Sequence, residues 1–429
     1  MSGGSVILTV YRGATAGLAI FAPLLLKRRE RQGKEDALRL GERSGIASRP
    51  RPPGQLVWLH GASVGEAIAL LPLIEALRAR NMQIVLTTGT VTSAGLMQTR
   101  LPQDAIHQFV PLDVPQFVRR FLDHWQPDLA LFAESELWPN CVMETARRKI
   151  PLALVNARLS ERSSRRWKKL PATIGSLLGH IDVTLAQTQE DAARFAELGA
   201  RKVGVPGNLK YDVPALPCDQ LELSDLKVRV GARPVWVAAS THEGEEEIAM
   251  AAHTRLTQHW PNLLTIIVPR HPERGASIAS LAAAQDLNVC LRSRKEKFSS
   301  SGCIYVADTI GELGLFYRVA NIVFVGRSLI RHGGQNPIEP AKLGAAILHG
   351  PHIANFGDVY RDLDATGGAI EVAGTDALGD TLAELFADSA RTRGMARAAS
   401  ETVEQLGGAT GKIMQAIEPY LTSARPERD

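Results

Sequence analysis

The sequence lacks the motifs that mark several large protein classes. Its 429 residues include only four cysteines, which lie far apart and form no C-x-x-C pair. A disulfide framework or a structural zinc site is therefore disfavoured, and a reducing compartment fits. The chain also has no G-x-G-x-x-G fingerprint, no Walker loop, no H-E-x-x-H pattern and no metal-ligand cluster.

The chain also lacks a strong overall charge, since its formal net charge is +4. Most of that excess lies in residues 27–51, which hold nine Lys and Arg against four Asp and Glu. The rest of the chain is nearly neutral. Binding of nucleic acid across the whole surface is therefore not indicated.

One long apolar run stands at the N-terminus. Residues 6–26 are mostly apolar, interrupted by Arg12 and followed by K-R-R-E-R-Q-G-K. This length is just enough to span a bilayer, and the basic flank predicts that the rest of the chain lies in the cytoplasm. A cleaved signal peptide is disfavoured because the charges follow the apolar run. We predict a membrane anchor; a helix lying in the membrane interface and a helix buried in protein remain alternatives.

The length of the chain predicts two domains. Residues 27–53 are charged and end in a Pro-rich stretch, which indicates a linker. Strand-like runs then alternate with helical patterns, which predicts parallel strands with right-handed crossovers. The segment V-P-A-L-P-C-D at 213–219 breaks this alternation. We expect an anchor with its basic flank at 1–30 and two α/β domains, doubly wound and Rossmann-like, at 31–212 and 220–429, facing a cleft.

The positions of the expected strands follow from apolar runs bounded by turn residues. They are 55–60, 84–88, 107–110, 128–133, 152–156, 182–187, 234–240, 264–268, 288–291, 304–306, 322–325, 346–348 and 369–372. Helical patterns lie between most of them, for example at 65–80 and 139–149.

The stretch L-V-W-L-H-G-A-S-V-G-E at 56–66 is the most informative of the chain. A buried strand ends in a Gly-rich turn, and Glu66 opens a helix at the edge where α/β sheets bind ligands. The same letters match the G-x-S-x-G elbow of serine hydrolases, with Ser63 as nucleophile. A third interpretation is purely structural, with Ser63 as a helix cap and Glu66 as a first-turn acid.

Two further segments of the first domain carry charged side chains at strand ends. Glu134 and Glu136, in A-E-S-E-L-W-P-N, follow a buried strand on the same rim as Glu66. Lys210, in V-P-G-N-L-K-Y-D, closes the first domain and could offer a cation into the cleft. Helix entry for the two acids and a solvated surface position for the lysine are the structural alternatives.

In the second domain, three segments suit an anionic ligand. V-P-R-H-P places Arg270 at a strand end, where a guanidinium can bind phosphate. T-I-G-E-L at 309–313 opens a helix. In R-H-G-G-Q-N-P-I-E-P, Gly333 and Gly334 are expected to leave backbone N–H groups free for an anion. Asn336, Pro337 and Glu339 there resemble a capping box, so Glu339 either caps the helix or accepts bonds from ribose hydroxyls.

A basic cluster lies at 158–169, R-L-S-E-R-S-S-R-R-W-K-K, with six basic residues and one acid around Trp167. It is either a solvated helix face or, beside a membrane anchor, a surface for lipid headgroups.

Five motifs in order resemble those of the bacterial Kdo (3-deoxy-D-manno-octulosonic acid) transferases of lipopolysaccharide assembly. They are W-L-H-G-A-S-V-G-E, E-S-E-L-W-P-N, G-N-L-K-Y-D, P-R-H-P-E-R and N-P-I-E-P-A. The resemblance runs from the anchor to about residue 420. It implies a glycosyltransferase B fold, a lipid A precursor (lipid IVA) bound by the first domain and CMP-Kdo bound by the second. It also implies an inner-membrane enzyme that needs no cofactor and no metal.

The resemblance also implies roles for individual residues. Glu66 is the expected general base that deprotonates the acceptor's 6′-hydroxyl, with Glu136 and Lys210 stabilising the transition state. The expected contacts to CMP are Pro269, Arg270, Ile310, Gly311, Glu312, Asn336, Pro337, Ile338 and Glu339. Two alternatives stay open: a serine hydrolase that uses Ser63, and a non-catalytic nucleotide-binding module tethered to the membrane.

Overall fold

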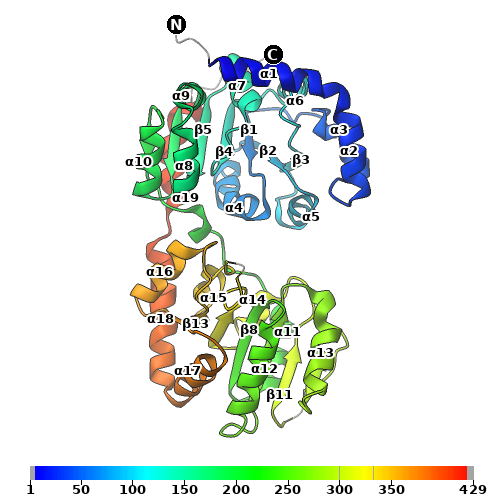
Figure 1. Cartoon of the computed structure of the whole chain (residues 1–429), viewed down its shortest axis with the longest axis vertical. Coiled ribbons are helices and arrows are strands. Elements are labelled where there is room, and N and C mark those ends of the chain that lie inside the picture. The colour runs from blue at the N-terminus through cyan, green and yellow to red at the C-terminus, as the bar shows by residue number, and fades with distance from the viewer. Residues whose placement is uncertain (1–4, 299, 332, 423–429) are drawn as a thin grey trace. The chain divides into compact units, whose positions relative to one another are not determined.

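The computed structural model describes residues 5–298, 300–331 and 333–422. The chain forms two compact units, one of Met1–Val213 with Gly407–Asp429 and one of Pro214–Leu406 (Figure 1). The division falls at the start of the 213–219 break in the sequence pattern. Each unit holds one seven-stranded sheet, and the fold class expected from the alternation, α/β with parallel strands, is confirmed.

The first unit has the strand order β3-β2-β1-β4-β5-β6-β7, and every pair is parallel. The strands are β1 (Leu56–His60), β2 (Gln83–Thr88), β3 (Ile106–Phe109), β4 (Leu129–Ala133), β5 (Leu152–Ala157), β6 (Val183–Ala186) and β7 (Val203–Gly204). The chain moves outward in one direction from β1 and then returns to start at β4. The neighbours β1 and β4 therefore form the topological switch point, where sheets of this kind bind ligands.

The second unit has the order β10-β11-β9-β8-β12-β13-β14, again with parallel pairs throughout. The strands are β8 (Val235–Thr241), β9 (Leu264–Pro269), β10 (Val289–Leu291), β11 (Cys303–Val306), β12 (Ile322–Val325), β13 (Ala346–His349) and β14 (Ala369–Glu371). Its switch point lies between β8 and β12.

Helices connect successive strands in each unit. In the first unit they are α1 (Val6–Leu18), η1 (Ala19–Phe21), α2 (Ala22–Arg31), η2 (Ala37–Arg39), α3 (Leu40–Arg43), α4 (Val64–Arg78), α5 (Val91–Arg100), α6 (Pro115–Trp125), α7 (Pro139–Arg147), α8 (Glu161–Trp167), α9 (Pro171–Leu178), α10 (Gln189–Glu197), η3 (Leu209–Tyr211) and α19 (Ala409–Thr422). In the second they are α11 (Gln220–Val230), α12 (Glu245–Leu256), η4 (Pro272–Arg274), α13 (Gly275–Ala283), α14 (Leu313–Phe316), α15 (Ile338–Lys342), α16 (Gly357–Ala365), α17 (Thr375–Ala387) and α18 (Ser389–Gln405).

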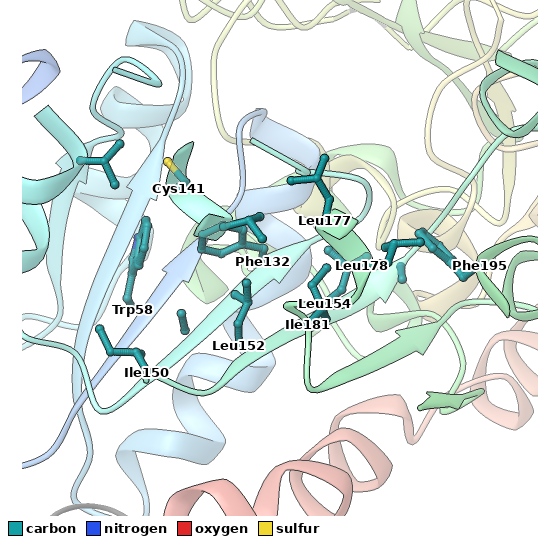
Figure 2. Close-up of a cluster of buried hydrophobic side chains, with 14 of the residues drawn as sticks. Trp58, Phe132, Cys141, Ile150, Leu152, Leu154, Leu177, Leu178, Ile181 and Phe195 are labelled. Carbon is teal, nitrogen blue, oxygen red and sulfur yellow. The ribbon is translucent and has the colours of Figure 1, made fainter. Parts of the chain in front are cut away.

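Both faces of each sheet are covered at its centre: β1, β4 and β5 of the first sheet and β9 and β12 of the second are buried along their whole length. On one face of the first sheet, Trp58 packs against Phe121 and Phe132 with ring centroids 4.7 and 4.8 Å apart. The same cluster continues through Leu154 to Phe195 (Figure 2). These side chains hold β1 and β4 rigidly against their covering helices.

The interpretation of residues 27–53 as a linker is wrong. Glu42 and Arg43 in α3 are almost fully buried, and Glu42 accepts a hydrogen bond from the backbone N–H of Phe109 at 2.7 Å. Arg43 donates to the carbonyl oxygens of Gly89 and Val110 and pairs with Glu35. Because these charged side chains satisfy the ends of neighbouring strands, the segment is part of the first unit although its composition resembles a linker.

The C-terminal end also differs from the predicted second domain of 220–429. Helix α19 returns to the first unit, where Ile413 and Ile417 join the core with Leu70 and Ile74 of α4. Asp212 anchors the start of this return by accepting hydrogen bonds from the backbone N–H groups of Gly408 and Thr410. The apolar spacing of a helix cannot show which of two sheets it covers.

The N-terminal segment Val6–Arg31 is the one helical stretch among the described residues that is long and apolar enough to cross a membrane. It fits the predicted anchor by length and composition. In the structure it consists of α1, η1 and α2, which follow one another without a loop.

Candidate active site

The turn between β1 and α4 places Glu66 at the switch point of the first sheet. Ser63 is the N-cap of α4, and its hydroxyl accepts from the Glu66 N–H at 3.3 Å. In return the Glu66 carboxylate accepts from the Ser63 hydroxyl at 2.6 Å and from the Ala62 N–H at 2.8 Å. This reciprocal cap fixes the carboxylate at the carboxyl end of β1. No ion pair holds Glu66 among the described residues.

Burial raises the pKa of Glu66 above that of an ordinary glutamate, and the negative charges of Glu136 and Glu134 raise it further. The hydrogen bonds from Ser63 and Ala62 oppose this shift but do not cancel it. A helix N-terminus alone would favour the carboxylate and weaken it as a base. Desolvation and two neighbouring acids instead make Glu66 a better proton acceptor than an ordinary glutamate.

Ser63 does not have the geometry of a hydrolase nucleophile. Its backbone angles, φ −107° and ψ 169°, are ordinary extended values, whereas the nucleophile of an elbow sits on a strained turn. Its hydroxyl donates to Glu66 as part of the helix cap. The structure therefore supports the capping interpretation of Ser63.

The segment after β4 brings two more acids to the same switch point. The Glu134 carboxylate lies 3.2 Å from the Lys210 ammonium nitrogen. Glu136 Oε2 lies 3.3 Å from His60 Nε2 and accepts from the Trp138 indole N–H. Burial raises the pKa of Glu136, but the contacts with His60 and Trp138 outweigh burial and lower it.

Glu66, Glu134 and Glu136 thus come from the ends of β1 and β4, as the sequence predicted, and Lys210 comes from η3. The pairing within the group was not predicted. Lys210 is salt-bridged to Glu134, and Glu136 instead contacts His60, the last residue of β1. Glu66 and Glu136 have pKa values shifted in opposite directions, so one acid is set up to take a proton and the other to stay ionised.

His60 is a site residue that sequence reasoning missed. Its ring is buried, and its Nδ1 lies 3.0 Å from the Thr87 hydroxyl on β2. The available signal was a histidine that ends an otherwise apolar strand next to the Glu66 turn. Such a histidine holds the neighbouring Glu136 in place without being exposed itself.

In the second unit, Pro269 ends β9 and Arg270 follows it at the sheet edge. Pro269 is buried and Arg270 is exposed. The Arg270 N–H donates to the Thr241 carbonyl oxygen at 3.0 Å, which fixes the backbone. Among the described residues no carboxylate pairs with the Arg270 guanidinium. An arginine that is anchored by its backbone and unpaired at its tip suits an incoming phosphate.

The segment before α14 is exposed at Ile310, where 87% of the surface is accessible, and turns at Gly311 with φ +85°. Glu312 is tied down by Arg292, with contacts of 2.6 and 3.1 Å, and by the Thr309 hydroxyl. Arg292 and then Thr309 lower the pKa of Glu312 despite its partial burial. Its carboxylate therefore stays ionised and holds the 309–312 turn in shape.

The Gly333-Gly334 turn differs from the predicted anion cradle at one position. The Gly334 N–H donates to the Arg327 carbonyl oxygen at 2.7 Å, so it is not free. Both glycines have positive φ, +89° and +75°, and a Cβ at Gly333 would lie 3.1 Å from the Asn355 side chain. These glycines are needed for the path of the chain.

The start of α15 is close to the predicted one. Asn336 accepts from the Ile338 N–H at 3.0 Å, and Pro337 stands directly before the helix. Pro337 and Ile338 are buried, whereas Asn336 and Glu339 are partly exposed at this edge. The predicted donor residues thus lie after β9, β11 and β12, all at the carboxyl edge of the second sheet.

Glu245 is a second residue that sequence reasoning missed. This buried carboxylate accepts hydrogen bonds from the backbone N–H groups of Arg327, Ser328, Leu329 and His242, at 2.7 to 3.1 Å. It joins the turn after β8 to the turn after β12 at the switch point of the second sheet. The run of acids at 243–247 gave no sign of which one is buried.

Replacing Glu245 by alanine is expected to lower the stability of the second unit by about 3 kcal/mol. The change leaves several buried N–H groups without acceptors, at about 1–3 kcal/mol each, partly relieved by water. Urea denaturation followed by circular dichroism measures the loss. Glu243→Ala, an exposed neighbour, is the matched control and should change little; equal stability of the two variants would contradict the role given to Glu245.

Among residues 5–298, 300–331 and 333–422, no group of three His, Cys, Asp or Glu side chains is placed to hold a metal ion. The independence of metals and cofactors stays a prediction.

Comparison with known proteins identifies the family of the chain. Residues 38–213 match the family model of 3-Deoxy-D-manno-octulosonic-acid transferase (kdotransferase). The chain is 35% identical over 390 residues to the 3-deoxy-D-manno-octulosonic acid transferase of Haemophilus influenzae, covering 89% of this chain and 91% of the relative. It is also 35% identical to the enzyme of that name from Bordetella pertussis, covering 96% and 99%.

Solved structures show the fold. A putative UDP-N-acetylglucosamine 2-epimerase from Listeria monocytogenes matches with a TM-score of 0.61 at 14% identity, over 88% of this chain and 99% of that one. A glycosyltransferase from Rickettsia africae matches with a TM-score of 0.57 at 11% identity, over 87% and 100%. The fold is therefore of the expected glycosyltransferase B type. With sequence identity extending over nearly the whole length of its relatives, the chain belongs to the 3-deoxy-D-manno-octulosonic acid transferase family.

Proposed function

We propose that the chain transfers Kdo from CMP-Kdo to the 6′-hydroxyl of lipid IVA, with inversion at the anomeric carbon. Glu66 takes the proton from the hydroxyl, the oxygen forms a bond to the anomeric carbon of Kdo, and the bond to the CMP phosphate breaks. CMP leaves with the electron pair of that bond. The reaction needs a base on the acceptor side and positive charge beside the departing phosphate.

The observation that carries this proposal is the state of Glu66. Its carboxylate stands at the switch point of the first sheet with a raised pKa, held by two hydrogen bonds and, within the part of the chain that the structure describes, by no cation. A purely capping glutamate would be exposed and would have a lowered pKa. The environment of Glu66 is therefore that of a base rather than that of a cap alone.

Charges of the opposite sign support the donor side of the proposal. Arg270, whose guanidinium has no carboxylate partner in the described parts of the chain, offers its positive charge at the edge of the second sheet to the phosphate of CMP. Asn336 and Glu339 are partly exposed at the same edge and would contact the sugar and base of the nucleotide. Glu312 would act by shaping the 309–312 turn, since its carboxylate is already paired with Arg292.

On the acceptor side, Lys210 and Glu136 complete the site. Lys210 brings positive charge beside Glu134, and Glu136 remains ionised because its pKa is lowered. An oxocarbenium-like transition state carries positive charge on the sugar ring, which nearby carboxylates stabilise. The apolar N-terminal helix would keep the enzyme at the cytoplasmic side of the inner membrane, where a lipid acceptor resides.

Incubation with CMP-Kdo and lipid IVA tests the proposal directly. We expect acceptor-dependent release of CMP and a lipid product whose mass increases by one Kdo residue or more. CMP release without acceptor measures hydrolysis and is the control. CMP binding without turnover would instead support a nucleotide-binding module. Labelling of Ser63 by a fluorophosphonate would support a hydrolase.

The dependence of kcat/KM on pH should show the raised pKa of Glu66. A base must be ionised, so activity should fall as the pH drops through a value above the ordinary glutamate pKa of 4.5. Ser63→Ala removes a hydrogen bond that lowers this pKa, so the acid limb should move to higher pH. If the acid limb of the kcat/KM profile lies at the same pH in Ser63→Ala and in the wild type, its assignment to Glu66 is contradicted.

A further inference from the structure

The apolar N-terminal helix contacts the first unit at both of its ends. At its start, the Ser5 hydroxyl is hydrogen-bonded to Thr173 of α9 at 2.8 Å. Further along, Ala22 is buried against Val114 and Phe117, and Leu26 is buried near the end of the segment. From residue 5 to residue 22 a helix rises by about 26 Å, close to the hydrocarbon thickness of a bilayer, about 30 Å. A helix that spanned the bilayer could not touch one globular unit at both ends.

Polar contacts continue along the inner face between these ends. The Tyr11 hydroxyl donates to Asp113 at 2.9 Å, and Arg12 forms an ion pair with the buried Glu144. Thr15 accepts from the Asn140 side chain at 3.0 Å. In a bilayer these polar side chains would lose their partners, and Arg12 alone would cost about 2–3 kcal/mol near the centre of a spanning helix. A helix that lies on the protein therefore explains why an arginine interrupts the apolar run: Arg12 pairs with Glu144.

The outer face of the same helix is apolar and exposed. Leu8 and Leu26 point inward and are buried, so the segment is divided into two faces. The exposed large apolar side chains are Val6, Ile7, Val10, Leu18, Ile20, Phe21, Leu24 and Leu25, each between 47% and 79% accessible. A patch of this kind on a soluble unit marks a binding surface.

Basic side chains stand at both ends of this apolar face. Lys27, Arg28 and Arg31 are exposed at the end of α2. At the other end, α9 contacts Ser5 and is preceded by the exposed residues Arg165, Arg166, Lys168 and Lys169 of the 158–169 cluster. Basic residues flank the cytoplasmic side of membrane segments. Basic residues at both ends of the helical segment indicate that both ends lie on the cytoplasmic side of the membrane. They also suit the anionic lipid headgroups of that leaflet.

We propose that α1, η1 and α2 lie in the plane of the membrane, with the outer apolar face inserted into one leaflet and both ends in the cytoplasmic interface. Such a helix enters the leaflet by about 5–10 Å. The two basic clusters contact anionic headgroups. This inference refines the membrane attachment in the proposed function, and its readout is the side of the membrane on which the N-terminus lies, not transfer activity.

The test uses the full chain with an N-terminal tag joined through a protease site, in inverted inner-membrane vesicles whose cytoplasmic face is outside. We expect added protease to remove the tag from intact vesicles as completely as it does after detergent. A spanning helix would place the tag inside, so removal only after detergent would overturn the proposal. Loss of the protein from washed vesicles together with a cross-linked dimer would also overturn it, in favour of a second copy covering this face.

A pair of charged substitutions tests the outer face separately. Ile20→Glu with Leu24→Glu should weaken association with vesicles of phosphatidylcholine and phosphatidylglycerol at least tenfold, because both side chains would be inserted in the leaflet. Leu281→Glu, at an exposed leucine of the second unit, is the matched control and should leave association unchanged. Equal association of the double variant and the wild type would contradict insertion of this face.

Charge reversal at Arg165, Arg166 and Lys168 tests the second basic cluster. The triple variant should bind anionic vesicles several-fold more weakly, with a difference that shrinks as salt is added. Arg393→Glu, at an exposed arginine of α18, controls for a reversal elsewhere on the surface. Unchanged binding of the triple variant would make the cluster an ordinary solvated face and would remove the headgroup contact at that end.

Discussion

Replacing Glu66 by glutamine is expected to reduce the rate of Kdo transfer by about 10²- to 10⁴-fold, the usual contribution of a general base. Glutamine keeps an oxygen that can accept a hydrogen bond from Ala62 or Ser63, so the α4 cap persists. It cannot take the proton of the acceptor hydroxyl. Steady-state CMP release in the presence of lipid IVA measures the effect.

Binding and folding controls separate this loss of chemistry from damage to the structure. The Glu66→Gln variant should bind CMP with unchanged affinity, because the expected CMP contacts lie in the other unit. It should also unfold at the same temperature as the wild type. Transfer at a near-normal rate would remove Glu66 from the mechanism, and loss of CMP binding would show a wider disturbance.

Replacing Lys210 by methionine is expected to reduce transfer by about 10²- to 10³-fold, the cost of removing one preorganised charge from an active site. Methionine keeps much of the length of the side chain without its charge. The change also leaves Glu134 without the ammonium group 3.2 Å away. Because the charge of Glu134 already raises the pKa of Glu66, the acid limb of the pH profile should move upward as well.

The double variant Lys210→Met with Glu134→Gln distinguishes two roles of the lysine. If Lys210 only neutralises Glu134, removing both charges should restore most of the activity. If Lys210 stabilises the negative charge that develops on the departing group during transfer, the double variant should remain as slow as Lys210→Met. We expect the second result. Recovery in the double variant would limit Lys210 to a positioning role.

The strands of both sheets could be predicted from the sequence to within one residue at each end. The run 322–325 is apolar throughout and 264–268 is apolar except for Thr265, as expected of parallel strands buried on both faces. The exception is β7, whose two residues, Val203 and Gly204, are too few to make a pattern. The strand ends also predicted where Glu66, Glu134 and Glu136 would meet, since parallel strands end at a common edge.

The partners of these residues could not be predicted in the same way. Nothing in the spacing of the motifs shows that Lys210 pairs with Glu134 or that His60 contacts Glu136. Those pairings depend on the side-chain directions at the ends of β1 and β4. The burial of Glu245 could not be predicted either, because Glu245 is one of four acids close together at 243–247.

Composition was misleading where charged residues are buried. Residues 27–53 have the charge and prolines of a linker, yet Glu42 and Arg43 are packed against the end of β3. The apolar run with its basic flank predicts a membrane anchor, and Val6–Arg31 has the length and composition for one; the partner of Arg12 could not be predicted. The ion pair of Arg12 with Glu144 depends on the position of α7, which lies more than a hundred residues away along the chain.

Chemical rescue of Glu66→Ala by formate tests the central claim most directly. Alanine leaves space for a small carboxylate beside Ser63, and formate can accept the proton in place of the missing side chain. We predict that transfer by Glu66→Ala rises with formate concentration and saturates, while the wild type and Arg270→Ala do not respond. A Glu66→Ala variant that binds CMP normally but gains nothing from formate, or one that transfers Kdo at the wild-type rate without it, would contradict the account.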